Sequence, residues 1–175
     1  MRLIRRATGY DAGACAAIYK PIVEGSIISF EENAPEEAEM RERIESTLEE
    51  HEWLVYQEGD RILGYAYSGP FNKRAAYRWS IEISVYVSED CRGRGIGREL
   101  TEALLEHASE TGVVNAFAGV ALPNPASVAL FEKLGFERIA LQEQVGYKLG
   151  AWHDVGWWQL KLSTAPVPPP ARSAG

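Results

Sequence analysis

The sequence feature that most constrains what this chain can fold into is a glycine- and arginine-rich turn, which lies between a strand pattern and a helix pattern. Apolar and polar residues alternate over residues 81–87, which indicates a strand, and residues 98–111 follow a helical pattern. The turn between them reads Arg92, Gly93, Arg94, Gly95, Ile96, Gly97 and Arg98. Glycine lets a backbone approach an anion without Cβ clashes, and amides at a helix start point at it. The order strand, turn, helix therefore predicts a pyrophosphate site.

Composition limits the class of ligand. The 175 residues suggest one domain, and 25 acidic against 18 basic residues give a net charge of −7. That balance argues against a general nucleic-acid binder. The arginines of the turn are basic against this acidic background, which suits a small polyanion better than a long one.

The two cysteines, Cys15 and Cys91, are too few for a disulfide scaffold. The chain has no CxxC or HExxH pattern, so we expect no metal. No stretch resembles a signal peptide or reaches the length of a membrane helix. We therefore expect a soluble cytoplasmic protein, and we interpret Cys91 as incidental rather than nucleophilic.

Turn signals and periodicity predict a mixed order of strands and helices. The expected strands are residues 3–7, 53–57, 61–67, 80–87, 114–121, 136–141, 144–148 and 153–162, with 27–31 extended. The expected helices run from Asp11 up to Pro21, from Pro35 with Met40, Ile44 and Leu48 on one face, over 98–111, and from Asn124 to Gly135. This order indicates an α/β or α+β sheet covered on both faces. Residues 1–164 form the predicted domain, and the Pro-rich residues 165–175 a flexible tail.

Two segments resemble the cofactor motifs of the GNAT superfamily of N-acetyltransferases. Residues 92–97 resemble its Q/R-x-x-G-x-G/A signature, and Asn124 to Phe136 looks like its second cofactor segment. A closer resemblance, to phosphinothricin and methionine sulfoximine or sulfone acetyltransferases, covers nearly the whole chain. The block Trp152–Leu160 carries it best, with matches at 29–32, 69–71, 77–79 and 82–87. This resemblance implies a twisted mixed sheet with acetyl-CoA between splayed central strands, and it also implies a homodimer.

The resemblance also implies an activity and a set of cofactor contacts. The activity is acetyl-CoA-dependent N-acetylation of a small amino acid or analogue. Residues 92–98 would bind the pyrophosphate. Backbone groups of Val85, Tyr86 and Val87 would contact the pantetheine and the thioester oxygen. Asn124 and Ser127 would contact the CoA arm.

Glu82 is the candidate general base. Alternation puts Glu82, Ser84 and Tyr86 on one strand face, leading directly to the turn. Partial burial there would raise the pKa of the Glu82 carboxyl towards a useful value. The competing interpretation is a solvent-facing strand glutamate.

Five residues are candidates for substrate binding. Arg74, Tyr77 and Arg78 follow the Gly69–Pro70 turn, and arginine can clamp a substrate carboxylate with two hydrogen bonds. They can equally be surface residues of a loop. Phe30 and Glu31 resemble substrate-pocket residues, although Phe30 can equally belong to the core.

Phe131 departs from the family pattern, which often has His or Tyr at this position. Phe can neither donate nor accept a proton, so water or Tyr86 would protonate the leaving thiolate. We interpret Phe131 as packing, His153 as a structural hydrogen-bonding residue, and His51 and His107 as surface residues. Two alternatives remain: acetylation of protein N-termini or ribosomal proteins, and a non-catalytic acyl-CoA-binding sensor.

Overall fold

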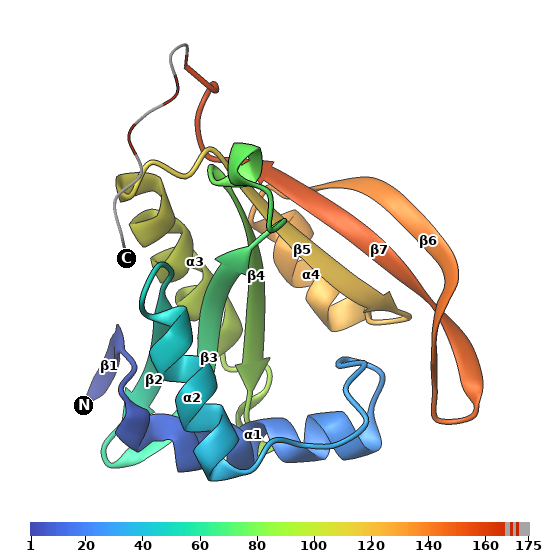
Figure 1. Ribbon diagram of the computed structural model, residues 1–175. Helices are drawn as coiled ribbons and strands as arrows, with labels where there is room; N and C mark the ends of the chain where they lie inside the picture. The colour runs from blue at the N-terminus through green and yellow to red at the C-terminus, as the bar shows by residue number, and fades with distance from the viewer. Residues whose placement is uncertain (167–168, 170, 172–175) are drawn as a thin grey trace.

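Seven strands form one sheet in the computed structural model, which describes residues 1–166, 169 and 171 (Figure 1). The strands are β1 (Arg2–Arg6), β2 (Trp53–Glu58), β3 (Arg61–Pro70), β4 (Ser80–Val87), β5 (Asn115–Leu122), β6 (Glu137–Lys148) and β7 (Ala151–Lys161). Their order across the sheet is β1-β2-β3-β4-β5-β7-β6. Within the described chain β4 and β5 form the one parallel pair, and the other neighbours are antiparallel. The predicted mixed sheet is confirmed.

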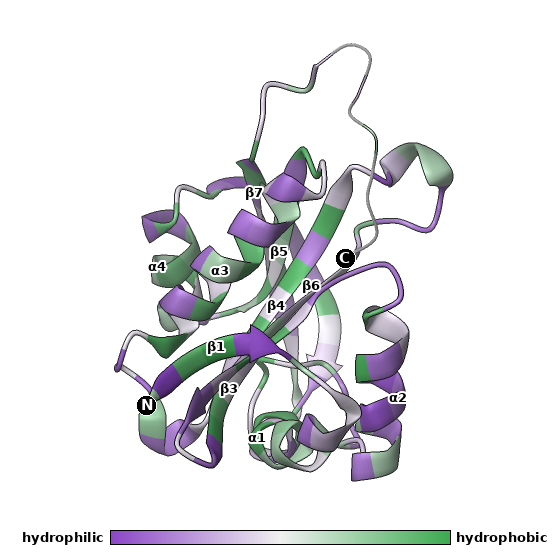
Figure 2. Ribbon diagram, turned by 90° about the vertical axis from the view of Figure 1, so that its left-hand side faces the viewer, coloured by the Kyte–Doolittle hydropathy of each residue, from purple (hydrophilic) through white to green (hydrophobic). Residues whose placement is uncertain are grey.

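Helices cover both faces of this sheet. They are α1 (Ala12–Gly25), α2 (Glu37–Thr47), α3 (Ile96–Glu110) and α4 (Pro125–Lys133). Side chains of α1 and α2 form one buried cluster with β2 and β3, and those of α3 and α4 form another on the opposite face. The outward side of α2 is hydrophilic (Figure 2), while Met40 and Ile44 are buried beneath it. No helix in the described ranges combines the length and apolar character needed to cross a membrane.

Several predicted elements differ from those in the structure. The first helix continues through Pro21 to Gly25, because burial of Ile22 and Val23 offsets the one hydrogen bond that a proline removes. The third helix begins at Ile96 instead of residue 98. Residues 27–29, predicted to be extended, form bends. Where two strands were expected between residues 136 and 148, the structure has one, β6, which is irregular between Gln142 and Gly146.

The parallel pair separates soon after it forms. The register joins Ser80–Glu82 to Asn115–Phe117 and ends there, although β4 continues to Val87 and β5 to Leu122. Figure 1 shows β4 and β5 diverging from this point, with α4 beside the opening. The sheet therefore contains a V-shaped slot between its central strands.

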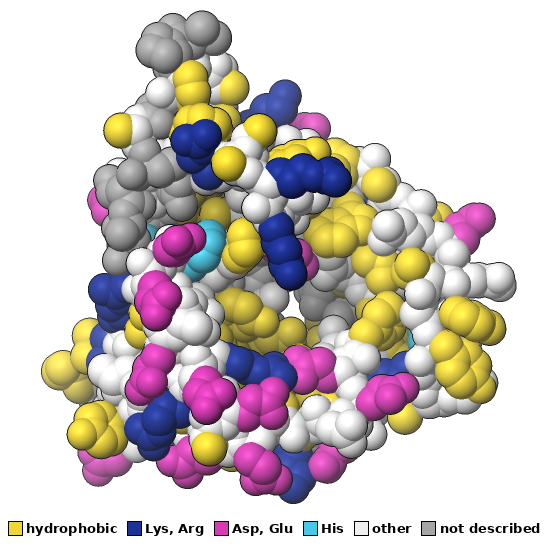
Figure 3. Space-filling view, in the orientation of Figure 1, with side chains coloured by type: hydrophobic (Ala, Val, Ile, Leu, Met, Phe, Trp, Pro, Cys, Tyr) yellow, Lys and Arg dark blue, Asp and Glu magenta, His cyan; other side chains and the backbone are white. Residues whose placement is uncertain are grey.

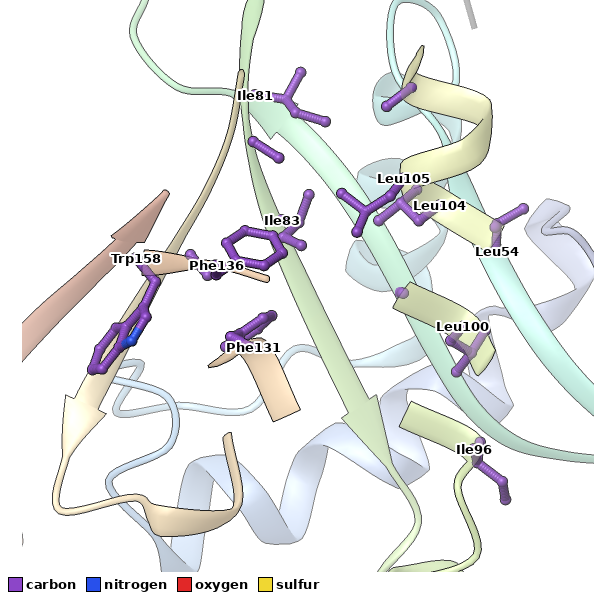
Figure 4. Close-up of a cluster of buried hydrophobic side chains, with 14 of the residues drawn as sticks. Leu54, Ile81, Ile83, Ile96, Leu100, Leu104, Leu105, Phe131, Phe136 and Trp158 are labelled. Carbon is purple, nitrogen blue, oxygen red and sulfur yellow. The ribbon is translucent and has the colours of Figure 1, made fainter. Parts of the chain in front are cut away.

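The core beside this slot is aromatic. Figure 4 shows Phe131 and Phe136 lying between Ile83 of β4 and Trp158 of β7. Phe131 is 4% exposed, and its ring centroid lies 5.3 Å from that of Phe136, so its interpretation as a packing residue is confirmed. The predicted tail, residues 165–175, lies largely outside the described residues.

Candidate active site

The glycine turn adopts a conformation that requires glycine at two positions. Gly93 has φ +77° and Gly95 has φ +83°, both in the left-handed region. Gly97 lies in the first turn of α3, where a Cβ would be 3.6 and 3.8 Å from the side chains of Val87 and Val85. The first amides of an α-helix have no intrahelical acceptor. The turn therefore presents free helical amides beside the open end of β4.

The arginines of the turn are exposed, and two of them are paired. The Arg94 guanidinium donates to Glu58 at 2.8 Å, and the Arg98 Nε donates to Glu102 at 2.7 Å. Exposed pairs of this kind contribute little to stability, about 0–1 kcal/mol. Both cations can therefore exchange a carboxylate for a phosphate at small cost.

The backbone of β4 also offers hydrogen-bonding groups to the slot. The Ser88 N–H donates to the Leu63 carbonyl of β3 at 2.9 Å. Because the direction of backbone groups alternates along a strand, those of Val85 and Val87 point the other way, towards β5. Beyond Glu82 the register with β5 has ended, so these groups face the slot.

A small cavity of about 40 Å³ lies in the slot. Its lining combines β4, β5, α4 and the connection after α1: Ile28, Ile83, Ser84, Val85, Tyr86, Gly119, Val120, Ala121, Asn124, Ser127 and Phe131. Asn124 caps α4, since its side-chain oxygen accepts from the Ser127 N–H at 3.1 Å. Four of the predicted site residues, in two separate sequence segments, thus meet around one opening: Val85, Tyr86, Asn124 and Ser127.

Glu82 occupies the last paired position before the strands separate. It lies opposite Gly69 of β3 and Phe117 of β5, and it is half-buried. Burial raises the pKa of its carboxyl above the ordinary value. A half-buried carboxylate with a raised pKa at the mouth of a slot can accept a proton from a neighbouring group.

Aromatic side chains surround the face that carries Glu82. Tyr86 contacts Tyr19 at 4.8 Å and Tyr65 at 5.4 Å between ring centroids. On the other side Phe117 stacks on Phe71 at 4.1 Å. Figure 3 shows a hollow in the middle of the molecule, with hydrophobic side chains in it and acidic and basic side chains around its rim. Burial also raises the pKa of Tyr86 well above its usual value.

The connection between α1 and α2 brings Phe30 and Glu31 to this side of the molecule. The Glu31 carboxylate accepts two hydrogen bonds from Arg43, at 2.7 and 2.9 Å, and one from the Tyr19 hydroxyl at 2.9 Å. The Arg43 guanidinium holds the pKa of Glu31 below its usual range. Phe30 is 38% exposed and lies against the β6–β7 hairpin, with its ring 6.4 Å from that of His153. Phe30 is therefore not a core residue.

Arg74, Tyr77 and Arg78 lie on the exposed segment between β3 and β4. The Tyr77 ring packs edge-on against Phe71 at 5.9 Å, which connects this segment to Phe117 beside Glu82. All three predicted residues line a hollow of about 490 Å³. The structure puts them at the rim of the aromatic face, in a different hollow from the slot.

Three further residues settle other sequence interpretations. The His153 Nε2 lies 2.9 Å from the Lys148 carbonyl oxygen, which confirms a structural hydrogen bond. The His107 side chain is 33% exposed and its Nε2 lies 3.3 Å from a Glu52 oxygen, so it lies at the edge of the core instead of fully in solvent. Cys91 is 2% exposed and belongs to the core.

Sequence reasoning missed Tyr19, Arg43 and Lys148. Arg43 lies four residues after Glu39 on a charged helix, and it resembles part of a solvated surface. Nothing in the local pattern indicates that it also reaches Glu31 across the fold.

Comparisons with known proteins agree with this geometry. Residues 4–157 match the family model of the acetyltransferase (GNAT) domain. Over 169 residues, 97% of this chain and 92% of the relative, the chain is 35% identical to phosphinothricin N-acetyltransferase of Streptomyces viridochromogenes. Over 174 residues, 98% and 97% of the two chains, it is 33% identical to L-methionine sulfoximine/L-methionine sulfone acetyltransferase of Pseudomonas aeruginosa.

A solved structure is similar over almost the whole length. It is a GNAT superfamily phosphinothricin acetyltransferase from Sinorhizobium meliloti in complex with AcCoA, with TM-score 0.91 and 30% identity, covering 99% of this chain and 95% of that one. Fold and sequence together define an N-acetyltransferase. The chain belongs to the GNAT acetyltransferase family.

Proposed function

We propose that this enzyme transfers the acetyl group of acetyl-CoA to the amino group of a small amino acid or analogue. Methionine sulfoximine, methionine sulfone and phosphinothricin are the candidate substrates, because the similar enzymes carry these names. The observation that carries the proposal is the position of Glu82, half-buried where β4 and β5 separate. There a carboxylate meets both an open slot and an aromatic hollow.

The slot and the glycine turn fit acetyl-CoA. The turn, residues 92–98, and the first amides of α3 would hold the pyrophosphate, with the helix dipole behind them. Asn124 and Ser127 would hold the pantetheine arm along the slot. Backbone groups of Val85 and Val87 face the same opening, and an N–H there would stabilise negative charge on the thioester oxygen.

Glu82 then acts as the general base. It accepts the proton that the amine loses as the new N–C bond forms and the C–S bond breaks. The raised pKa of Glu82 improves its match to this task near neutral pH. Since Phe131 carries no exchangeable proton, Tyr86 or water supplies the proton that the leaving thiolate takes up. Tyr86 lines the slot, and its high pKa keeps it protonated.

The amino-acid substrate would be recognised at the rim. Arg74 and Arg78 can each donate two hydrogen bonds to a carboxylate, with Tyr77 beside them. Phe30 and Glu31 would bound the opposite side of the aromatic hollow beside Glu82. Glu31 already pairs with Arg43, so in this proposal it positions its neighbours.

Thiol release with a panel of amines tests the proposal. We expect acetyl-CoA turnover with at least one of the three analogues, and none with protein N-termini. Turnover only with peptide N-termini would favour the alternative acetylation of proteins. Tight CoA binding without turnover on any amine would favour a binding sensor.

We further propose a homodimer formed through the β6–β7 hairpin. Six of its large apolar side chains are 43–61% exposed: Ile139, Leu141, Val145, Tyr147, Leu149 and Trp152. A cluster of this kind on an edge of the sheet favours association with a second copy. Light scattering of the wild-type enzyme should give twice the monomer mass, and the Trp152→Glu variant should have a lower mass. A monomeric wild-type enzyme would contradict this proposal.

A further inference from the structure

A buried lysine lies between two parts of the chain that are distant in sequence. Lys148, the last residue of β6, is 7% exposed. Its Nζ donates to the carbonyl oxygens of Val23 and Ser29, both at 2.6 Å. Val23 lies in the last turn of α1, and Ser29 lies in the connection that carries Phe30 and Glu31. The ammonium thus joins the C-terminal hairpin to this connection.

The connection is held at the same point from two other elements. Tyr19 of α1 shares a hydrogen bond of 2.7 Å with the Ser29 hydroxyl. Arg43 of α2 pairs with Glu31 through two donors. These contacts fix the two residues on either side of Phe30, and Lys148 adds the contact to the hairpin.

Phe30 makes a second contact with the hairpin. Its ring occupies the space above Gly146, where an added Cβ would lie within 2.6 Å of the ring. Gly146 pairs with His153 across the hairpin, and His153 also contacts the Lys148 carbonyl. The hairpin therefore supports both the backbone of the connection and the ring that it presents.

We propose that Lys148 is a positioning residue for the amine substrate: it fixes residues 26–31 against the β6–β7 hairpin and so holds Phe30 in place as one wall of the amine site. This inference rests on the proposed function, because it concerns that same site. The acetyl-CoA side is built mostly from other elements, namely the turn, β4, α3 and α4, and Ile28 is the one residue of the connection among those that line the slot. Loss of Lys148 therefore affects the amine more than the cofactor.

The chemistry of the contact supports a purpose beyond stability. A buried ammonium is unfavourable unless its donors are satisfied, and here neutral carbonyl groups satisfy them. Burial also lowers the pKa of Lys148. An apolar side chain could fill the same volume at lower cost, but it could not bond two carbonyl groups of a connection that lacks regular structure.

The primary variant is Lys148→Met, which keeps an unbranched side chain of similar volume and removes its donors. Lys161→Met, an exposed lysine on β7, is the matched control. We expect Lys148→Met to raise the KM for the amine about 10- to 100-fold, because Phe30 would no longer be held in its position beside the substrate. The KM for acetyl-CoA should change less than about twofold. Hydrogen exchange of residues 26–33 should become faster in the same variant.

A second variant tests the wall from the hairpin side. Gly146→Ala should displace the Phe30 ring and raise the KM for the amine. If it acts through Phe30, adding it to Phe30→Ala should produce no further change. An additive effect in the double variant would contradict the contact.

Each outcome separates this inference from the proposed function. If Lys148→Met changes neither the hydrogen exchange of residues 26–33 nor the KM for the amine, the inference is overturned. It is also overturned if the KM values for the amine and for acetyl-CoA rise equally while the melting temperature falls. Absence of wild-type turnover with every amine would overturn the proposed function. In that case the exchange measurement would still decide whether Lys148 holds the connection.

Discussion

Glu82→Gln should reduce activity and stabilise the fold at the same time. Gln keeps the volume of the side chain and cannot accept the proton of the amine. A general base contributes about 10²- to 10⁴-fold, which corresponds to about 3–5 kcal/mol of transition-state stabilisation. We therefore expect kcat to fall by that factor near neutral pH.

The stability change has the opposite sign because the pKa of Glu82 is raised by burial. Between the unfolded and folded pKa values the folded protein binds more protons than the unfolded chain, so stability falls as pH rises through this window. Above it the wild type bears the full cost of an ionised, half-buried carboxylate. Gln bears none, so the melting temperature of the variant should exceed that of the wild type at pH 8, and the difference should shrink in acid.

Thiol release at saturating acetyl-CoA, followed against pH, measures the kinetic effect. The wild-type rate should fall in acid at a higher pH than for an ordinary glutamate, and this limb should vanish in Glu82→Gln. Glu137→Gln, an exposed glutamate in β6, is the control and should match the wild type. An unchanged kcat in Glu82→Gln would remove Glu82 from its role.

Three other substitutions test separate parts of the site. Gly93→Ala and Gly59→Ala both place a Cβ in open space at positive φ, so each should lower stability by a similar amount, about 1–2 kcal/mol. Only Gly93→Ala should raise the KM for acetyl-CoA, and equal KM values in the two variants would contradict the role of the turn. Phe131→Ala should lower stability by about 3–5 kcal/mol in denaturant unfolding, and a loss below 1 kcal/mol would contradict its burial. Arg78→Ala should raise the KM for an amino-acid substrate about 10- to 100-fold while sparing amines that lack a carboxylate, and a uniform effect on both would refute the clamp.

The parts of the site formed by local sequence could be predicted. Alternation in β4 places Glu82 and Tyr86 on one face, and the glycines of the turn match its positive φ values. The cap of α4 at Asn124 likewise depends on residues close together in the chain. Local chemistry decides each of these features.

The parts formed by distant residues could not be predicted. The bonds of Lys148 join positions 125 and 119 residues apart, and no periodicity indicates such pairs. Pro21 shows the reverse case, in which a sound local rule predicts a helix end and packing beyond the proline overrides it. The substrate side of the site depends on such contacts more than the cofactor side does.

Transfer of a labelled acetyl group tests the central claim most directly. The enzyme is incubated with ¹³C-acetyl-CoA and the best amine of the panel, and product, free thiol and intact protein are measured together. We predict label on the amino nitrogen of the substrate, one thiol released for each acetylated amine, and no labelled protein. Thiol release without an acetylated amine, or label retained on the protein during turnover, would contradict direct transfer to an amine assisted by Glu82.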